Sequence, residues 1–508
     1  RDALCANTTA DQNTAVGFQS LCLNTTGINN SAVGSQTLLS NTTGCNNVAM
    51  GRLALNINTE GDENVAVGSC SLRRSTTANN NTAVGACSLM CNTTGTANVA
   101  VGHNSLKVST TGNDNTAVGR QSLDSNTTGC CNTALGTDAL GANTTADHNT
   151  AVGKNALLVN TTGAQNVAVG SLALDANTIG CRGVAIGYNA MGANTEGNFN
   201  TAVGRSALST NTTGDNIVSV GYASLQSSTT SSGNTSVGFE SMFLNTTGAT
   251  NTAMGLCSLR ANTTGANNVA VGRGALIANT TGDSNTAIGR DALCSVAGAG
   301  IENTSAGYIS GCSITTGDNN ITLGYRAGRD LTTGNCNILI GPSVNIDAGD
   351  TNNSIALGYN VSSIANALTF GSGGTDSRIA FGETSITAPS DQRLKEDIED
   401  DTAGLSFIND LRPVTYRWRK EKDIPEEMRT HVAGSEKRYN NDKVNHGFVA
   451  QEVKQAIDNH PELKDGFDMW QEEENLDGRQ RIAEGALIPM LVKAIQELTA
   501  RVKELEDE

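Results

Sequence analysis

The 508-residue chain is poor in aromatic residues, charged residues and proline. Aromatic residues make up 4% of it and charged residues 16%, and none of its six prolines precedes residue 342. A continuous parallel β-ladder uses every backbone N–H, so a long segment without proline is compatible with one. No stretch approaches the roughly 18 apolar residues of a membrane span, and we expect no membrane insertion. The net charge of −17 and the lack of a Lys/Arg cluster disfavour phosphate neutralisation, so we expect no nucleic-acid partner.

The charged residues are distributed unevenly along the chain. Residues 390–508 hold 18 of the 33 Lys+Arg and 28 of the 50 Asp+Glu, which leaves 15 and 22 for the first 389 residues. All 13 cysteines and 50 of the 56 glycines lie in that first part. Two architectures therefore meet near residue 389. We expect a repeat segment over 1–360, an irregular connector over 361–389 and a separate domain over 390–508.

A period of 17 residues organises the first segment. Glycine occupies every multiple of 17 from Gly17 to Gly289, and after a one-residue slip the series resumes at Gly307 and reaches Gly358, which makes 21 coils. Each position of the coil keeps its own chemistry. In the strict block from Gly17 to Gly289, an aliphatic residue precedes the glycine, Ala or Ser precedes that residue, and Leu or Met follows four positions after the glycine. The consensus is roughly NTAVGxxSLxxNTTGxx.

Seventeen residues are too few for a helix-pair repeat, and runs such as NTAVG are short and β-compatible. We therefore expect a β-solenoid in which each coil has two short strands and two turns. One coil buries too little apolar surface to offset its ordering entropy, so stability must come from stacking. The small alanine beside an aliphatic residue suits close approach of backbones between subunits, which points to an oligomer.

Cysteine and asparagine recur in fixed columns of the repeat. Cys5 and Cys22 are 17 residues apart, and we expect free thiols because side chains in a stacked column run parallel rather than towards each other. No Cys or His pattern has zinc spacing, so we expect no metal site and no cofactor. The NTT triplets would accept glycans in a secretory pathway. We favour a structural role, because asparagine tolerates left-handed turns and can hydrogen-bond along the stack.

The repeated NTAVG, NVAVG, GVAIG and NTAIG motifs resemble those in the heads of trimeric autotransporter adhesins. The same kind of repeat is found in phage and viral fibre proteins. This resemblance covers about residues 1–360 and implies a left-handed parallel β-roll assembled as a homotrimer.

The tail reads PSDQRLKEDI, INDLRPVTYRW, GFVAQEV and GALIPMLVKAIQELTARVKELEDE, and helical patterns separated by loops dominate it. In the last segment, apolar residues alternate by three and four, which predicts a coiled-coil helix; they are Ile488, Leu491, Ile495, Leu498, Val502 and Leu505. The four motifs resemble the endosialidase-type intramolecular chaperone, a C-terminal domain of phage tailspikes and fibres. The resemblance implies a mainly α-helical domain that directs trimerisation and then cuts itself off.

The resemblance also implies where the cut falls. The family cuts before a serine and uses that serine with a lysine five residues on, which here are Ser390 and Lys395, with Pro389 on the other side of the cut. A lysine can take the serine proton only if its surroundings favour the neutral amine. Five residues on an α-helix turn through about 140°, so Ser390 must lie on a turn, or the pair must assemble in the trimer. The alternative is that Ser390 caps a helix and Lys395 is a solvated residue.

Together these patterns predict a trimeric virion fibre or tailspike that attaches to a host surface. Its partners would be two further copies, a host receptor that is a glycan or a protein, and other virion proteins. The sequence RDALC at residue 1 recurs at Arg290–Cys294, so we expect the chain to begin within a coil and the virion-binding part to lie upstream.

The fibre would assemble in the host cytoplasm and be extracellular in the free particle. The alternatives are a cell-surface trimeric adhesin and, third, a polysaccharide-degrading tailspike. We expect no enzyme activity except one self-cleavage by a Ser-Lys dyad.

Overall fold

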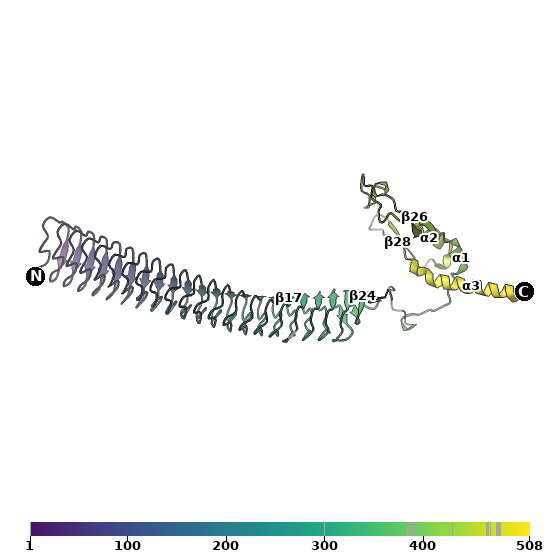
Figure 1. The fold of residues 1–508 in the computed structure, drawn as a ribbon, viewed down its shortest axis with the longest axis horizontal. Helices are drawn as coiled ribbons and strands as arrows, with labels where there is room; N and C mark the ends of the chain where they lie inside the picture. The colour runs from purple at the N-terminus through teal and green to yellow at the C-terminus, as the bar shows by residue number, and fades with distance from the viewer. Residues whose placement is uncertain are drawn as a thin grey trace. The chain divides into compact units, whose positions relative to one another are not determined.

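The structure is a computed structural model that describes all residues except 1, 299, 384–385, 388–389, 391, 429, 464–466, 468, 474–478 and 508. The chain forms two compact units, residues 1–389 and residues 390–508. No helix among the described residues is long and apolar enough to cross a membrane. Figure 1 shows the first unit as a row of stacked coils and the second as a smaller body with helices.

The first unit is a β-solenoid with one strand per coil. Consecutive strands pair in parallel, and each residue lies beside the residue one coil further on, as Ala15 beside Ala32. The strands are β1 (Thr14–Val16), β2 (Ser31–Val33), β3 (Val48–Met50), β4 (Val65–Val67), β5 (Thr82–Val84), β6 (Val99–Val101), β7 (Thr116–Val118), β8 (Thr133–Leu135), β9 (Thr150–Val152), β10 (Val167–Val169), β11 (Val184–Ile186), β12 (Thr201–Val203), β13 (Val218–Val220), β14 (Thr235–Val237), β15 (Thr252–Met254), β16 (Val269–Val271), β17 (Thr286–Ile288), β18 (Thr304–Ala306), β19 (Ile321–Leu323), β20 (Ile338–Ile340) and β22 (Ile355–Tyr359). The 17-residue β-solenoid expected from the sequence is confirmed.

The middle residue of each strand points into the coil and its two neighbours point outwards. Ala117 is fully buried, whereas Val16 and Met50, each directly before a column glycine, are 59% and 49% exposed. This follows from the alternation of side chains along a strand. The expectation that the alanines face another subunit is therefore wrong, because they pack in the core of their own coil against the leucine column. The outward residue is the aliphatic one.

The second strand expected in each coil is absent from the described strict repeats. The run after the glycine forms turns, because residues at alternate positions are left-handed: Gln19 has φ 52° and Leu21 has φ 51°. A positive φ is unusual for leucine and incompatible with a strand. Leu21 is nonetheless fully buried, so its place in the core stabilises this conformation.

Glycine and asparagine hold the stacked coils together. A Cβ at Gly136, whose φ is 142°, would lie 2.5 Å from the carbonyl oxygen of Gly153, so only glycine fits. In the NTT triplets, Asn41 Nδ2 donates to Asn24 Oδ1 at 2.8 Å, one coil away. The expected bonding along the stack is confirmed. The expected left-handed geometry is wrong for these two residues, which are not among those with positive φ.

Two pairs of cysteines are bonded. Cys5 bonds Cys22 and Cys294 bonds Cys312, with Cα atoms 5.0 and 4.7 Å apart. The expectation of free thiols is wrong for these four residues, because the distance between neighbouring coils falls within the range that a disulfide spans. The other nine cysteines are free.

The solenoid extends beyond residue 360, where the sequence suggested an irregular connector. Strand β24 (Ala367–Ser372) continues the parallel stack beside β22. Strand β25 (Ser377–Ala380) then pairs antiparallel with β24. A small second sheet is formed by β21 (Asn345–Ile346) and β23 (Ser362–Ser363).

The second unit contains helices and short antiparallel sheets around one apolar core, so the expectation of a mainly helical domain is too simple. Its elements are η1 (Gln392–Leu394), α1 (Leu405–Asp410), β26 (Val414–Tyr416), η2 (Glu421–Asp423), β27 (Asn445–Gly447), α2 (Ala450–Asn459), η3 (Pro461–Leu463), β28 (Trp470–Glu473), β29 (Arg479–Ile482), η4 (Glu484–Ala486) and α3 (Leu487–Asp507). Strand β26 pairs with β27 and β28 with β29. Phe407 on α1 is fully buried at the centre of the core.

Helix α3 has two apolar faces. Leu487, Met490 and Ala494 are buried in the core of the unit. The face expected to form a coiled-coil seam is exposed, with Ile495 at 62% and Leu505 at 72%. An exposed apolar stripe on a helix marks an interaction surface. The coiled coil itself stays a prediction.

Candidate active site

Ser390 and Lys395, the two residues expected to act together, are in contact. Lys395 Nζ donates a hydrogen bond of 2.8 Å to Ser390 Oγ. The contact is possible because the chain between them is not an α-helix. It forms the three-residue 3-10 helix η1, closed by the backbone bond from Lys395 N–H to the carbonyl of Gln392. Ser390 thus lies outside any helix, so the pair does not have to share one α-helical face.

This geometry bears on the two interpretations of Ser390. A nucleophile needs a base within hydrogen-bonding reach, and the 2.8 Å contact satisfies that requirement. The helix-cap interpretation needs an α-helix to cap, and η1 has only three residues. Pro389, on the other side of the expected cut, lies outside the described residues. The catalytic roles of Ser390 and Lys395 stay predictions.

Both side chains are exposed in the single chain. A lysine acts as a base when desolvation or neighbouring charges favour its neutral form. Ser390 and Lys395 therefore make the contact that the predicted cleavage needs, but the surrounding protein does not exclude water from them.

A histidine missed by the sequence analysis links two parts of the second unit. His460 is buried, with Nε2 3.0 Å from Asp410 Oδ2 at the end of α1 and Nδ1 2.8 Å from Glu462 Oε1. Its ring packs edge-on against Phe407. Burial acts to lower the pKa of His460, but the hydrogen bonds to Glu462 and Asp410 outweigh it and raise the pKa. No sequence signal identifies this cluster, because Asp410 and His460 are 50 residues apart.

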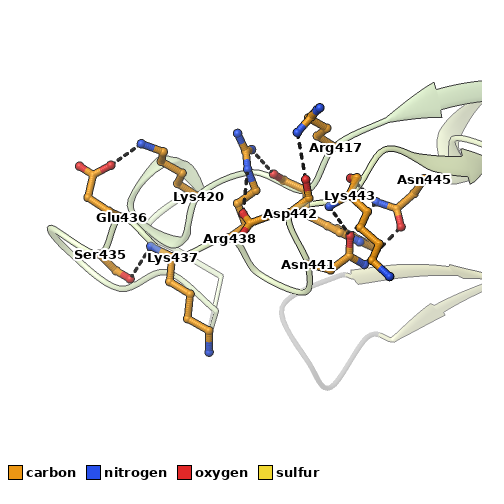
Figure 2. A network of polar contacts seen from close by, with 11 residues as sticks. Arg417, Lys420, Ser435, Glu436, Lys437, Arg438, Asn441, Asp442, Lys443 and Asn445 are labelled. Atoms are coloured by element: carbon orange, nitrogen blue, oxygen red, sulfur yellow. Dashed lines mark hydrogen bonds and ion pairs between the residues drawn. The ribbon is translucent and has the colours of Figure 1, made fainter.

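The segment after β26 is held by a polar network at the surface, drawn in Figure 2. Glu436 pairs with both Lys420 and Lys422, and the hydrogen bond from Lys420, followed by that from Lys422, lowers the pKa of Glu436 to about 2. Arg417 Nη1 donates to the carbonyl of Asp442 at 2.9 Å. These contacts join the segment around η2 to the loop before β27. Because the pairs are exposed, each contributes little to stability.

Two further contacts fix the helices of this unit. The carboxylate of Glu497 on α3 accepts a 2.9 Å hydrogen bond from Leu405 N–H, the first residue of α1. Arg412, just after α1, forms a forked ion pair with Glu452 on α2, in which Nε lies 2.9 Å from Oε2. Helices distant in the sequence are thereby held by charge-assisted hydrogen bonds.

Comparison with known families gives a match to part of the chain. Residues 390–461 match the family described as chaperone of endosialidase. None of the curated proteins compared with the chain matches it. The match begins at Ser390, the first residue of the second unit, and includes His460. A β-solenoid of about 21 turns followed by this match fits a tailspike-like fibre with a C-terminal chaperone.

Proposed function

We propose that this protein is a trimeric virion fibre for attachment to a host surface, assembled by a C-terminal chaperone that releases itself by cutting between Pro389 and Ser390. The observation that carries the proposal is the 2.8 Å contact between Lys395 and Ser390 at the start of the segment that matches a chaperone of endosialidase. The family match supports a chaperone, and the contact supports the cut.

Unpartnered apolar surfaces support the trimer. We define the pre-glycine column as the residue before each column glycine; it is Val, Ile, Leu or Met in every coil except for Ala306. Its members are exposed or half-buried along the whole solenoid. The outer face of α3 is a second such surface. Two further copies of the chain would cover both surfaces, because a repeated column matches an identical column related by a symmetry axis along the stack.

The cleavage chemistry uses only residues of this chain. Ser390 Oγ attacks the carbonyl carbon of Pro389 while Lys395 Nζ takes the hydroxyl proton. The amide bond breaks, its nitrogen receives the proton, and an ester joins Pro389 to Ser390 Oγ. Water then hydrolyses the ester, which leaves a carboxylate on Pro389 and a free amino group on Ser390. We propose that trimer assembly supplies the exclusion of water that the single chain lacks at Lys395, so that cutting follows assembly.

The test is the intact mass of the full-length chain expressed as wild type, Ser390→Ala, Lys395→Ala and Lys395→Arg. Lys443→Ala is the matched control, since Lys443 is also exposed in the second unit but is not in contact with Ser390. We expect the wild type and the control to separate into residues 1–389 and 390–508, with a trimeric first fragment by native mass spectrometry. The three other variants should stay whole. A wild type that stays whole contradicts the cut, and a monomeric first fragment contradicts the trimer.

The alternatives make different predictions for the same protein. A cell-surface trimeric adhesin would carry a secretion signal upstream in place of a virion-binding module. A polysaccharide-degrading tailspike would hydrolyse glycans, which requires a pair of carboxylates in a cleft. Glycan hydrolysis by the purified solenoid would favour that alternative over attachment alone.

A further inference from the structure

One column of the solenoid changes its chemistry about halfway along the stack. We define the post-glycine column as the residue directly after each column glycine. In the first ten coils it is mostly small, polar or basic, with Ser at 35, 69 and 171. In the last eleven coils it is aromatic, arginine, leucine or proline: Tyr188, Arg205, Tyr222, Phe239, Leu256, Arg273, Arg290, Tyr308, Tyr325, Pro342 and Tyr359. All five tyrosines of residues 1–389 lie in this column.

The side chains of this column form continuous stacks. The rings of Tyr222 and Phe239 are parallel to within 11° with centroids 5.2 Å apart. The guanidinium of Arg205 lies 5.9 Å from the ring centroids of both Tyr188 and Tyr222. Four consecutive coils therefore present one line of stacked planar groups. Further along, Tyr308 stacks on Tyr325 with centroids 5.7 Å apart, and Arg290 lies 5.3 Å from the Tyr308 ring.

The column is exposed and carries only positive charge. All eleven residues are exposed except Tyr308, which is half-buried. No coil of the 21 has Asp or Glu at this position. Arg205 and Arg273 form no ion pair with another described residue, whereas Arg290 pairs with the neighbouring Asp291 at 3.1 Å. An acidic protein thus presents a line of aromatic rings and unneutralised guanidinium groups.

These features determine the kind of ligand that fits. The exposed edges of the stacked rings can pack against the C–H groups of sugar rings, and a guanidinium group binds carboxylates through two parallel hydrogen bonds. Successive coils lie about 4.8 Å apart, so eleven coils extend over roughly 50 Å and a polymer can contact several of them at once. We propose that the post-glycine column from Tyr188 to Tyr359 binds a linear polysaccharide that carries carboxylates. The inference rests on the proposed attachment function and names the class of receptor.

Two other occupants fit the observations less well. A contact between copies of the chain should repeat over the whole stack, as the pre-glycine column does, whereas the aromatic run begins only at Tyr188. Single-stranded nucleic acid also stacks on aromatic rings, but its binding needs a positively charged groove along the backbone. The post-glycine column has three arginines in eleven coils on a chain of net charge −17.

The test measures binding of the full-length protein to alginate, a linear polyuronate, by biolayer interferometry. Carboxyl-reduced alginate tests the need for charge, and single-stranded poly-dT tests the nucleic-acid alternative. Serine occurs naturally in this column, so serine substitutions are compatible with the coil. The variants are Tyr222→Ser with Phe239→Ser and Arg205→Ser with Arg273→Ser, and the matched control is Arg52→Ser with Arg120→Ser, in the same column outside the aromatic run.

We expect the wild type to bind alginate more tightly than the other two probes, and more weakly as salt is raised. Each test pair should weaken binding by about fourfold to twenty-fivefold, at about two- to fivefold per exposed aromatic or cationic side chain, while the control pair stays within about twofold. The proposal is overturned by equal binding of reduced alginate, by preference for poly-dT, by salt-independent binding, by unchanged test pairs or by no binding. Native mass spectrometry of the same samples measures the oligomeric state separately. A monomer that binds alginate would contradict the proposed trimeric fibre but not the proposed polysaccharide site.

Discussion

Replacing Asn115 by alanine tests how the solenoid is held together. Asn115 is fully buried in the asparagine column four residues before the glycine. Its Oδ1 accepts the backbone N–H of Asn132 at 3.0 Å, and its Nδ2 donates to the carbonyl of Gly129 at 2.8 Å. Gly129 keeps a second donor in Asn126 Nδ2 at 3.0 Å, so the substitution leaves one buried group unpaired, the N–H of Asn132.

The cost follows from these contacts. A buried unpaired N–H costs about 1–3 kcal/mol. The lost side-chain bonds, whose other partners each keep a second hydrogen bond, cost about 1 kcal/mol more, so we expect about 2–4 kcal/mol of local destabilisation. Coils of a solenoid contact only their neighbours, and the loss should be confined to the coils around Asn115. Hydrogen exchange measured by mass spectrometry should show protection near Asn132 reduced by about 30- to 900-fold.

The asparagine column is naturally interrupted at one coil, and adding an asparagine there tests the opposite change. Gly183 stands where the column has asparagine, and its N–H donates to Asn166 Oδ1 at 2.7 Å. Its φ is not in the left-handed region, and a Cβ there would lie 3.1 Å from Asn166 Oδ1 and at least 3.4 Å from other atoms. In Gly183→Asn the new side chain can accept from Asn200 N–H and donate to the Gly197 carbonyl. We expect protection near Asn200 to rise, worth about 1–2 kcal/mol. Unchanged exchange in both variants would refute the role of the column.

Two further predictions concern the second unit. Ile495→Asp should abolish trimers of the uncut chain in native mass spectrometry but leave its circular dichroism unchanged, because Ile495 is 62% exposed. The control Ala494→Asp, at a core site only 4% exposed, should unfold the unit. Trimers that persist in Ile495→Asp would contradict a coiled-coil seam on this face of α3. The raised pKa of His460 means that the folded unit binds its proton more readily than the unfolded chain. Its contribution to stability is therefore fully present below the unfolded pKa of about 6.5 and is lost as pH rises through the higher folded pKa. Thermal melts of Ser390→Ala between pH 5 and 9 should show this loss, and adding His460→Gln should remove it.

The sequence was sufficient to predict the solenoid because its period is a property of the chain itself. Identical residues every 17 positions give each coil the same backbone, and identical coils stack in parallel register, as Ala117 does on Ala134. The absence of proline before residue 342 agrees with an unbroken ladder. The aromatic run of the post-glycine column was also present in the sequence, and aligning the coils on their glycines would have revealed it.

The interior of the coil could not be predicted in the same way. The choice between alanine and valine as the buried residue depends on the turn that precedes the strand, and shifting a strand by one residue exchanges its two faces. Leu21 has a left-handed conformation that burial in the stack stabilises, and this burial cannot be predicted from the conformational propensity of leucine. The bond between Cys5 and Cys22 likewise depends on the distance between coils.

For the second unit, the sequence by itself determined which residues belong to the candidate site, through motifs that resemble a known family. Only the tertiary structure decided that Lys395 contacts Ser390, because the contact requires the chain to turn at η1 and not to continue as an α-helix. Only the tertiary structure joined Asp410 to His460 and gave α3 one buried and one exposed apolar face. In the solenoid, the 17-residue period itself shows which residues of neighbouring coils are in contact. The contacts of the second unit join residues whose separation along the chain follows no repeat, so they cannot be found in this way.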